Sequence, residues 1–471
     1  MLELEFFGAA GEVTGSCHIL RVGERQVLLD CGMIQGGRDA EARNAKPFPF
    51  DPAEIDAVVL SHAHLDHAGR LPLLVKRGFS GRIHTQNASQ QLCEILLKDA
   101  GYLQENDAER RNRHRKHHEE RVVPLYTLAD AEETLPSFTG HRYHTWFDVC
   151  EGIRARFIDA GHILGSAVVE VEMVHETERR TLVFSGDLGQ FDSPFLRDPE
   201  SPGRADLVLM ESTYGGRSHR SREDTLLELE ELVRAAHAEK GNILVPAFAV
   251  GRSQEILYLL GKHFREWGLQ RWRIFLDSPR ALAATKVYWD NPHLYDDEAT
   301  RLSKTMNPMP SLPNLVLSRT ADDSRRINNI EAGAIIIAGS GMCTGGRILH
   351  HLKRNVFRPR ARIMFTGFQA YGTLGRRIVD GQKEIRLYGD TYEVKAQVST
   401  IGGLSAHGDA DDMSRWYSSI PGTPPVYLVH GDEDAAKAFK HKLSSEHGAQ
   451  VSLPKPGTRL DLKTLAAAAI A

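Results

Sequence analysis

The chain has 471 residues, of which 41% are hydrophobic and 25% are charged. Its length exceeds what one hydrophobic core usually serves, and its composition excludes disordered and fibrous classes. The net charge of −4 excludes nucleic-acid binding driven by global charge, so a nucleic-acid partner would need a local basic surface. Five cysteines without a CxxC pair argue against a disulfide framework and a cysteine zinc site, and they favour a reducing cytoplasm.

The first part of the chain has the pattern of a β-rich domain. Its N-terminus carries glutamates where a signal peptide has lysines, and no apolar run approaches the ~18 residues of a membrane helix, so we expect neither secretion nor a membrane span. Short apolar segments that end in glycine or polar turns predict strands at 2–8, 16–22, 26–32 and 55–62. Helical spacing follows at 88–104, and strand character returns at 153–162, 166–173 and 180–187.

A different pattern begins near residue 206, where predicted strands and helices alternate. The strands are expected at 206–212, 241–248, 273–279 and 332–341, and helices are expected at 225–241 and from Ser253. Regular alternation of this kind is typical of a parallel α/β domain. Strands resume at 394–403 and 424–431, each followed by a helix.

The segment from Ser61 to Gly69, SHAHLDHAG, contains four metal-capable side chains: His62, His64, Asp66 and His67. The preceding IDAVVLS is predicted to be a buried strand, so two histidines two residues apart at its end point the same way. The spacing differs from the helix-borne H-E-x-x-H of zinc proteases. Zinc accepts imidazole and carboxylate ligands readily, and two adjacent metal positions suit this pattern best. Further candidates follow other predicted strands, namely His162, Asp187 and His430.

In chain order, the motifs resemble those of the metallo-β-lactamase superfamily and its β-CASP branch. They are Asp30 in LLDCG, HAHLDH, His162, Asp187, Glu211 in ESTYG, His407 in LSAHGD and His430 in LVHGD. The resemblance covers essentially the whole chain and is greatest to RNA-cleaving members related to the eukaryotic cleavage and polyadenylation endonuclease subunit. It implies an αββα sandwich interrupted by a parallel α/β domain. We therefore expect metallo-β-lactamase segments at 1–208 and 396–471 and a β-CASP domain at 209–395.

The resemblance also implies a site with two Zn²⁺ ions. His62, His64 and His162 would hold one ion; Asp66, His67 and His430 would hold the other, and Asp187 would bridge them. Asp30 would orient a ligand by hydrogen bonding. His407 would be the general acid and Glu211 would hold it, and Asp66 and Asp187 complete the predicted catalytic residues. The hydroxide formed between the two ions would attack phosphorus.

The predicted substrate is single-stranded RNA, cleaved endonucleolytically. In the β-CASP branch a histidine at the position of His430 is associated with RNA-processing members, and valine with DNA-processing members. The alternatives are a DNA nuclease of the same branch, a small-substrate ester or thioester hydrolase on the same fold, and a scaffold that has lost catalysis. The first strand begins at once and 41 residues follow His430, so we expect a short, stand-alone cytoplasmic nuclease, with a homodimer as the alternative to a monomer.

Two further segments have an open interpretation. Residues 109–122 are rich in basic side chains and are interpreted either as an arm that contacts RNA phosphates or as a solvated helix balanced by glutamates. The basic residues concerned include Arg111, Arg113, Arg115 and Lys116. The glycine-rich stretch 339–347 lies between a predicted strand and helix and could present backbone N–H groups to a phosphate. It lacks the third glycine of G-x-G-x-x-G, so we expect no nucleotide cofactor.

Overall fold

The computed structural model describes residues 1–37, 39–113, 115, 120–305, 312–367 and 369–465, in two compact units. Unit 1 comprises Met1–Ser193, Arg197–Ser218 and His407–Ala471, and unit 2 comprises Pro194–Leu196 and His219–Ala406. The chain thus leaves unit 1 for a long insertion and returns to it at His407. Within the described residues, no helix combines the length and apolar character needed to cross a bilayer.

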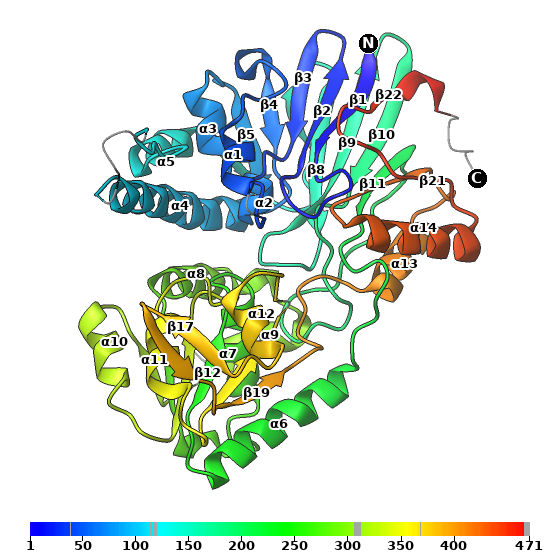
Figure 1. Ribbon diagram of the computed structural model, residues 1–471. Helices are drawn as coiled ribbons and strands as arrows, with labels where there is room; N and C mark the ends of the chain where they lie inside the picture. Colours follow the sequence, from blue (N-terminus) through cyan, green and yellow to red (C-terminus); the bar gives the residue numbers. More distant parts are fainter. Residues whose placement is uncertain (38, 114, 116–119, 306–311, 368, 466–471) are drawn as a thin grey trace. The chain divides into compact units, whose positions relative to one another are not determined.

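Unit 1 contains two seven-stranded sheets that pack face to face (Figure 1). The first sheet has the order β22-β1-β2-β3-β4-β5-β6. Its strands are β1 (Leu2–Gly8), β2 (Cys17–Val22), β3 (Arg25–Leu29), β4 (Ala57–Val59), β5 (Arg82–Gln86), β6 (Phe138–His141) and β22 (Arg459–Asp461). The second has the order β21-β20-β11-β10-β9-β8-β7. Its strands are β7 (Phe147–Cys150), β8 (Ile153–Asp159), β9 (Ala167–His175), β10 (Glu178–Phe184), β11 (Leu207–Glu211), β20 (Val426–Val429) and β21 (Val451–Ser452).

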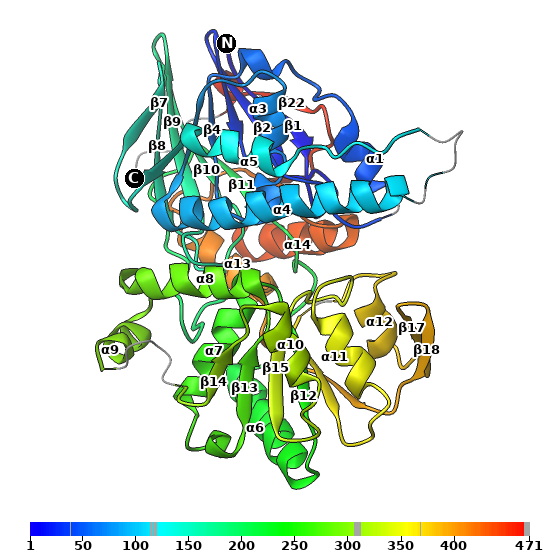
Figure 2. The same cartoon turned by 90° about the vertical axis from the view of Figure 1, so that its left-hand side faces the viewer.

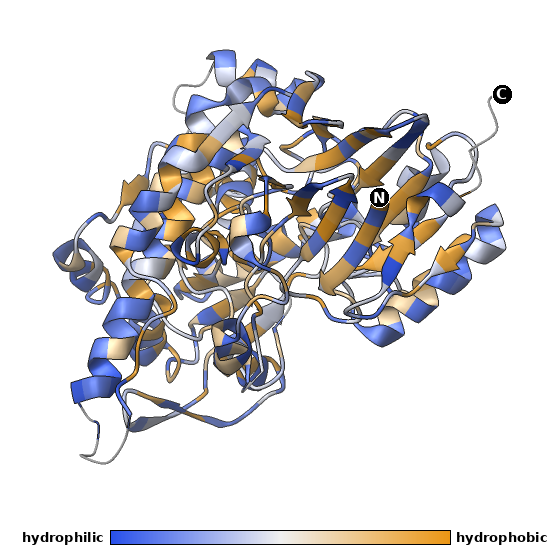
Figure 3. Cartoon of the chain, turned by 90° about the horizontal axis from the view of Figure 1, so that it is seen from above, coloured by the Kyte–Doolittle hydropathy of each residue, from blue (hydrophilic) through white to orange (hydrophobic). Residues whose placement is uncertain are grey.

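Side chains that alternate between the two faces of each strand form the core of the sandwich. Phe6, Leu20 and Leu29 of the first sheet share one core with Phe157 and Phe184 of the second. Because successive side chains of a strand point to opposite faces, the remaining side chains of each strand point outward, toward the helices. On the second sheet this outer face packs against α13 (Ala410–Ser418) and α14 (Glu433–His447). Figure 3 shows hydrophobic colouring concentrated on the strands, whereas the helices carry hydrophilic stretches.

The remaining helices of unit 1 lie on the side of the first sheet (Figure 2). They are α1 (Ala40–Ala45), α2 (Leu65–Ala68), α3 (Leu71–Lys76), α4 (Asn87–Arg113) and α5 (Leu128–Thr134), with short 3-10 turns at Pro52–Glu54 and Leu135–Ser137. A capping box at Thr127 and Asp130 begins α5. With helices outside both sheets, unit 1 is the expected αββα sandwich.

Unit 2 is built on a six-stranded parallel sheet of order β14-β13-β15-β12-β16-β19. Its strands are β12 (Ile243–Pro246), β13 (Arg273–Leu276), β14 (Leu315–Leu317), β15 (Ala334–Ala338), β16 (Arg362–Phe365) and β19 (Gln397–Thr400). Its helices are α6 (Arg222–Ala238), α7 (Arg252–Lys262), α8 (Pro279–Asp290), α9 (Asp297–Thr305), α10 (Ala321–Ile327), α11 (Ile348–Asn355) and α12 (Leu374–Val379). The hairpin of β17 (Glu384–Leu387) and β18 (Asp390–Glu393) lies beside α12 (Figure 2). The predicted strands at 241–248, 273–279, 332–341 and 394–403 belong to this parallel sheet, whereas those at 206–212 and 424–431 are β11 and β20 of unit 1.

Helices cover both faces of this sheet. Leu244, Ile336 and Phe365 share a core with residues of α10, α11 and α12. On the other face of the sheet, side chains such as those of Ile243 and Ile335 face apolar residues of α6 and α7. Such two-sided cover explains why the strands are near-continuous apolar runs.

Candidate metal centre

The predicted site residues gather where strands of both sheets in unit 1 end. His62 and His64 follow β4, His162 follows β8, Asp187 follows β10 and His430 follows β20. The parallel pairing of β10, β11 and β20 brings their carboxyl ends to one edge. The sequence places polar residues after these strands, and the packed sandwich then brings them together from positions far apart in the chain.

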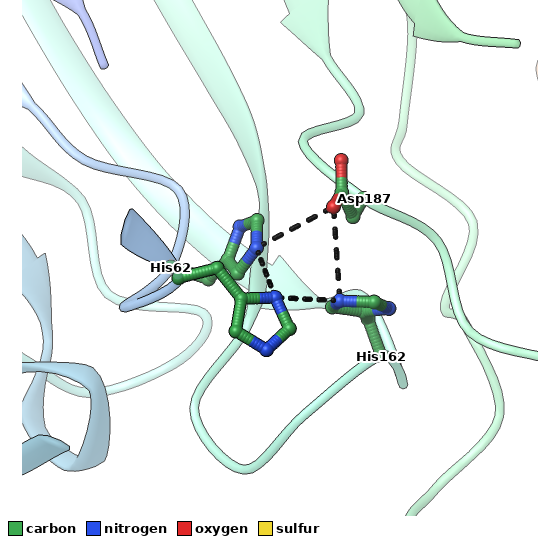
Figure 4. Close-up of side chains that lie close together, drawn as sticks. His62, His162 and Asp187 are labelled. Carbon is green, nitrogen blue, oxygen red and sulfur yellow. Dashed lines mark hydrogen bonds and ion pairs between the residues drawn. The ribbon is translucent and has the colours of Figure 1, made fainter. Parts of the chain in front are cut away.

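Three histidines and one carboxylate oxygen form the first ligand group. His64 Nδ1 lies 3.2 Å from His62 Nε2 and 3.1 Å from His162 Nε2. Asp187 Oδ2 lies 3.5 Å from His62 Nε2 and 3.7 Å from His162 Nε2. Figure 4 shows the side chains of His62, His162 and Asp187 converging on one point.

The second ligand group consists of Asp66, His67 and His430, and Asp187 lies between it and the first group. His67 Nε2 lies 3.0 Å from His430 Nε2, which is 3.5 Å from Asp66 Oδ2. Asp187 Oδ1 lies 3.3 Å from His67 Nε2. One carboxylate therefore points an oxygen at each group. Within the described residues, Asp187 Oδ1 is buried and has no hydrogen-bond partner, which is costly unless a cation is bound there.

The donor set fits zinc. Ligands of a tetrahedral zinc ion at ~2.0–2.1 Å are roughly 3.3–3.4 Å from one another, so the separations between the facing donor atoms are those expected around an ion. Imidazole nitrogens and carboxylate oxygens are also among the ligands that zinc binds readily. The residues fall into adjacent groups, His62, His64, His162 and Asp187 in one and Asp66, His67 and His430 in the next, and each group offers enough donor atoms for a metal ion.

Burial keeps two histidines of the first ligand group in the neutral form that can bind a cation. Desolvation lowers the pKa of His64 to about 4 and the pKa of His62 well below its usual value. Both imidazoles are therefore neutral at physiological pH, the state in which a ring nitrogen can bind metal. For Asp187, burial alone would raise the carboxyl pKa, but the surrounding histidines, His430 and His67 foremost, hold it well below its usual value.

Asp30 fixes the orientation of the second group. Its Oδ2 accepts hydrogen bonds from His67 Nδ1 at 2.7 Å and from the hydroxyls of Ser16 and Ser61, and its Oδ1 accepts from the Ser61 backbone N–H at 2.8 Å. Because the Asp30 carboxylate accepts the hydrogen bond of Nδ1–H, the neutral form of His67 has its lone pair on Nε2, which faces the ligand group. Asp30 (φ 60°) and His430 (φ 50°) both adopt left-handed backbone conformations, a strain that is typical of functional sites.

A histidine and glutamate pair lies beside the ligand groups. Glu211 is fully buried at the end of β11, and its oxygens lie 3.1 and 3.3 Å from His407 Nδ1. The Leu188 backbone N–H also donates to Glu211 at 2.6 Å. Burial opposes the charged form of His407, but Glu211 and Asp187 outweigh it and raise its pKa to about 9. His407 is therefore protonated at neutral pH and can act as a proton donor.

The structure brings together Asp30, the ligand residues, Glu211 and His407, all of which were candidates on sequence grounds. The supporting hydroxyls of Ser16, Ser61 and Thr213 were missed; Thr213 Oγ1 lies 3.0 Å from His430 Nδ1. Ser61 precedes the ligand residue His62, but Ser16 and Thr213 are adjacent to no ligand residue, so no local pattern marked those two.

The predicted strand IDAVVLS is shorter than expected. It ends at Val59, because the Ser61 N–H bonds to Asp30 instead of a neighbouring strand. His64 consequently lies at the N-cap of α2 and not on a strand.

The basic segment is not part of this cluster. Arg111 is engaged by Glu41 at 2.6 and 2.9 Å and by Asp107 at 3.1 Å, as expected for a solvated helix end. Arg113 and Arg115 are exposed, and Lys116 lies outside the described residues. A role of this segment in RNA contact stays a prediction.

Comparison with known proteins assigns each part of the chain. Family models match at residues 25–247 (beta-lactamase superfamily domain), 253–378 (Beta-Casp domain) and 391–454 (Zn-dependent metallo-hydrolase RNA specificity domain). "Ribonuclease TTHA0252" of Thermus thermophilus is 40% identical over 96% of this chain and 98% of its own length. The "RNase J-like protein" of Methanocaldococcus jannaschii is 27% identical over 98% and 100%.

Two further proteins agree with this assignment. "Transcription termination factor FttA" of Methanosarcina mazei is 29% identical over 95% of this chain and 70% of its own length. A crystal structure of a protein of unknown function from Enterococcus faecalis matches with a TM-score of 0.53 at 11% identity, over 98% of this chain and 99% of that one, which shows the shared fold. Together with the ligand geometry, these matches show that the chain belongs to the β-CASP branch of the metallo-β-lactamase superfamily.

Proposed function

We propose that this protein is a zinc-dependent ribonuclease that hydrolyses phosphodiester bonds within single-stranded RNA. The observation that carries the proposal is the pair of ligand groups, with one oxygen of Asp187 directed at each, beside the protonated His407. The names of its relatives, a ribonuclease and an RNase J-like protein, support RNA as the substrate.

The ligand groups define what the protein residues contribute. His62, His64 and His162 would hold one zinc ion, Asp66, His67 and His430 the other, and Asp187 would bind both. Bound zinc would lower the pKa of a coordinated water toward about 7 and stabilise negative charge on the phosphate. Asp30, by fixing the tautomer of His67, keeps Nε2 directed at the ion.

His407 is proposed as the general acid. Hydrolysis expels a sugar alkoxide, a poor leaving group unless it receives a proton as the bond breaks. Glu211 binds Nδ1, so the proton delivered to the leaving oxygen is the one on Nε2. The buried Glu211 carboxylate also stabilises the imidazolium until the transfer occurs.

Matched RNA and DNA oligonucleotides, labelled at one end and incubated with the zinc-loaded full chain, test the proposal. We expect internal cuts in RNA, little cleavage of DNA, and two zinc ions per chain by elemental analysis. His407→Ala should keep both zinc ions and lose nearly all cleavage. His441→Ala, at an exposed histidine of α14, is the control and should cleave normally.

Two results would reject the proposal. If the purified chain binds no zinc after reconstitution, the metal assignment is wrong. If zinc binds but RNA stays intact, the ribonuclease assignment is wrong.

A further inference from the structure

At the carboxyl edge of the unit 2 sheet, the connections that follow two neighbouring strands diverge. β12 and β15 are parallel neighbours, but the chain leaves β12 toward α7 on one face and leaves β15 toward α11 on the other. Where successive connections diverge to opposite faces, the loops separate and leave room for a ligand outside the strand ends. The loop after β12 contains Phe248, and the loop after β15 is the glycine-rich stretch 339–347.

Phe248 stands at this divergence with 44% of its surface exposed. Its ring packs on the backbone of Gly341, because a Cβ atom at Gly341 would lie 2.9 Å from the ring. Glycine is required there by this close approach. The backbone therefore supports one part of the ring while the rest stays open to solvent, a combination that suits a stacking surface.

A third loop at the same edge presents a second aromatic ring. Gln369 Nε2 donates to the Gly341 carbonyl at 3.1 Å, so the loop that follows β16 packs against the glycine-rich loop. Two residues later Tyr371 is 97% exposed. The ring of Tyr371 is therefore open to solvent and available for stacking at this edge.

The same edge favours an anionic ligand. The helices α8 and α11 begin here, and neither has an acidic residue in its first turn, where the helix dipole favours one. Arg347 lies in the glycine-rich loop, where its guanidinium bonds to the buried Asp277 at 2.7 Å and the Ser318 carbonyl at 3.0 Å. The amides of Thr344 and Gly345, however, already donate to Ser340 Oγ, so the loop is not a ready-made phosphate cradle.

We propose that the carboxyl edge of the unit 2 sheet binds unpaired RNA bases by stacking on Phe248 and Tyr371. Bases have flat π-faces that stack on aromatic side chains, and this binding mode tolerates any base sequence. The inference rests on the proposed ribonuclease function and adds a separate binding surface for the strand. A second copy of this chain is the competing occupant, which the test distinguishes.

Equilibrium binding of two fluorescent oligonucleotides to the protein tests whether RNA bases stack on these two rings. One is single-stranded RNA, and the other has the same backbone with abasic positions. The full chain carrying His407→Ala serves as the parent, so that the RNA stays intact. Phe248→Ala and Tyr371→Ala are each compared with Phe357→Ala, because Phe357 is 43% exposed and precedes β16, at the opposite edge of the same sheet.

We expect Phe248→Ala and Tyr371→Ala each to weaken RNA binding by about fivefold or more while leaving abasic binding unchanged. Phe248→Trp should restore binding, and Phe357→Ala should have no effect. Equal losses for RNA and the abasic backbone, or no loss at all, would overturn the inference. So would Phe248→Ala converting a dimer to a monomer without changing base-dependent affinity. If the His407→Ala parent itself binds no RNA, the result contradicts the proposed ribonuclease function, on which this inference rests.

Discussion

Replacing Asp30 with asparagine changes one atom of the structure and, by our reasoning, removes a metal ligand. Both carboxylate oxygens of Asp30 face donors, Ser61 N–H at Oδ1 and His67 Nδ1–H at Oδ2. If the asparagine amide nitrogen takes the Oδ2 position, His67 must accept at Nδ1 and carry its proton on Nε2. That tautomer cannot bind metal through Nε2.

The opposite orientation of the asparagine amide is also unfavourable. With the amide nitrogen at the Oδ1 position, two donors, the asparagine N–H and the Ser61 N–H, face each other in a buried site, which costs roughly 1–3 kcal/mol. Losing a carboxylate that orients a histidine ligand typically lowers metal affinity about 10–100-fold. This corresponds to ~1.4–2.7 kcal/mol of zinc-binding free energy.

Competitive titration of the metal-free chain with a chromophoric zinc chelator measures this loss. We expect Asp30→Asn to weaken one of two zinc sites and to leave the other near its original affinity. Ser16→Ala is the matched control, because it removes a hydrogen bond to the same carboxylate oxygen but leaves the tautomer of His67 unchanged. Circular dichroism confirms that each variant is folded. Two zinc sites of unaltered affinity in folded Asp30→Asn would refute the reasoning.

Three other predictions concern the metal ions and the proton donor. Because Asp187 serves both ligand groups, Asp187→Ala should lower zinc content more than His162→Ala, which should lose one ion; equal stoichiometry by elemental analysis contradicts the shared role. Because His407 has a pKa of about 9, its acid form is present below that pH and is lost as pH rises through it, so kcat/KM should fall on the alkaline side. Glu211→Gln should move this fall to lower pH, and an unmoved profile would exclude His407 as the acid. Chelation should lower Tm, since ligands that bind only the folded state stabilise it; an unchanged Tm would speak against buried metal.

The H-x-H-x-D-H run could be recognised from sequence because its donors are neighbours in the chain. His162, Asp187 and His430 were recognisable as polar residues after strands, but their convergence depends on two sheets packing together. The division of Asp187 between two groups, one oxygen for each, is a matter of side-chain rotation that no spacing encodes. Glu211 and His407 have no local pattern and entered through family resemblance alone.

The fold could be predicted from the sequence to a similar extent. Apolar periodicity located several strands of both units, since burial on one or both faces leaves a direct trace in the sequence. The α/β pattern was read from residue 206, but the strand there, β11, pairs with β10 and β20 of unit 1. The end of β4 was placed too late, because a long-range hydrogen bond between Ser61 and Asp30 decides it. Likewise, the support of Phe248 by Gly341 depends on a contact between loops almost a hundred positions apart in the chain.

The ligands come from both halves of the sandwich, with His62 and His67 beyond the first sheet and His162, Asp187 and His430 beyond the second. Metal binding would therefore add a cross-link between two layers that also share an apolar core and backbone hydrogen bonds, such as that from Ala167 N–H to the Ser61 carbonyl at 2.9 Å. A chain whose sheets have separated keeps only part of each ligand set, so zinc affinity and cohesion of the sandwich are thermodynamically linked. Zinc limitation would then expose the strand ends of this edge before it unfolds the remaining core.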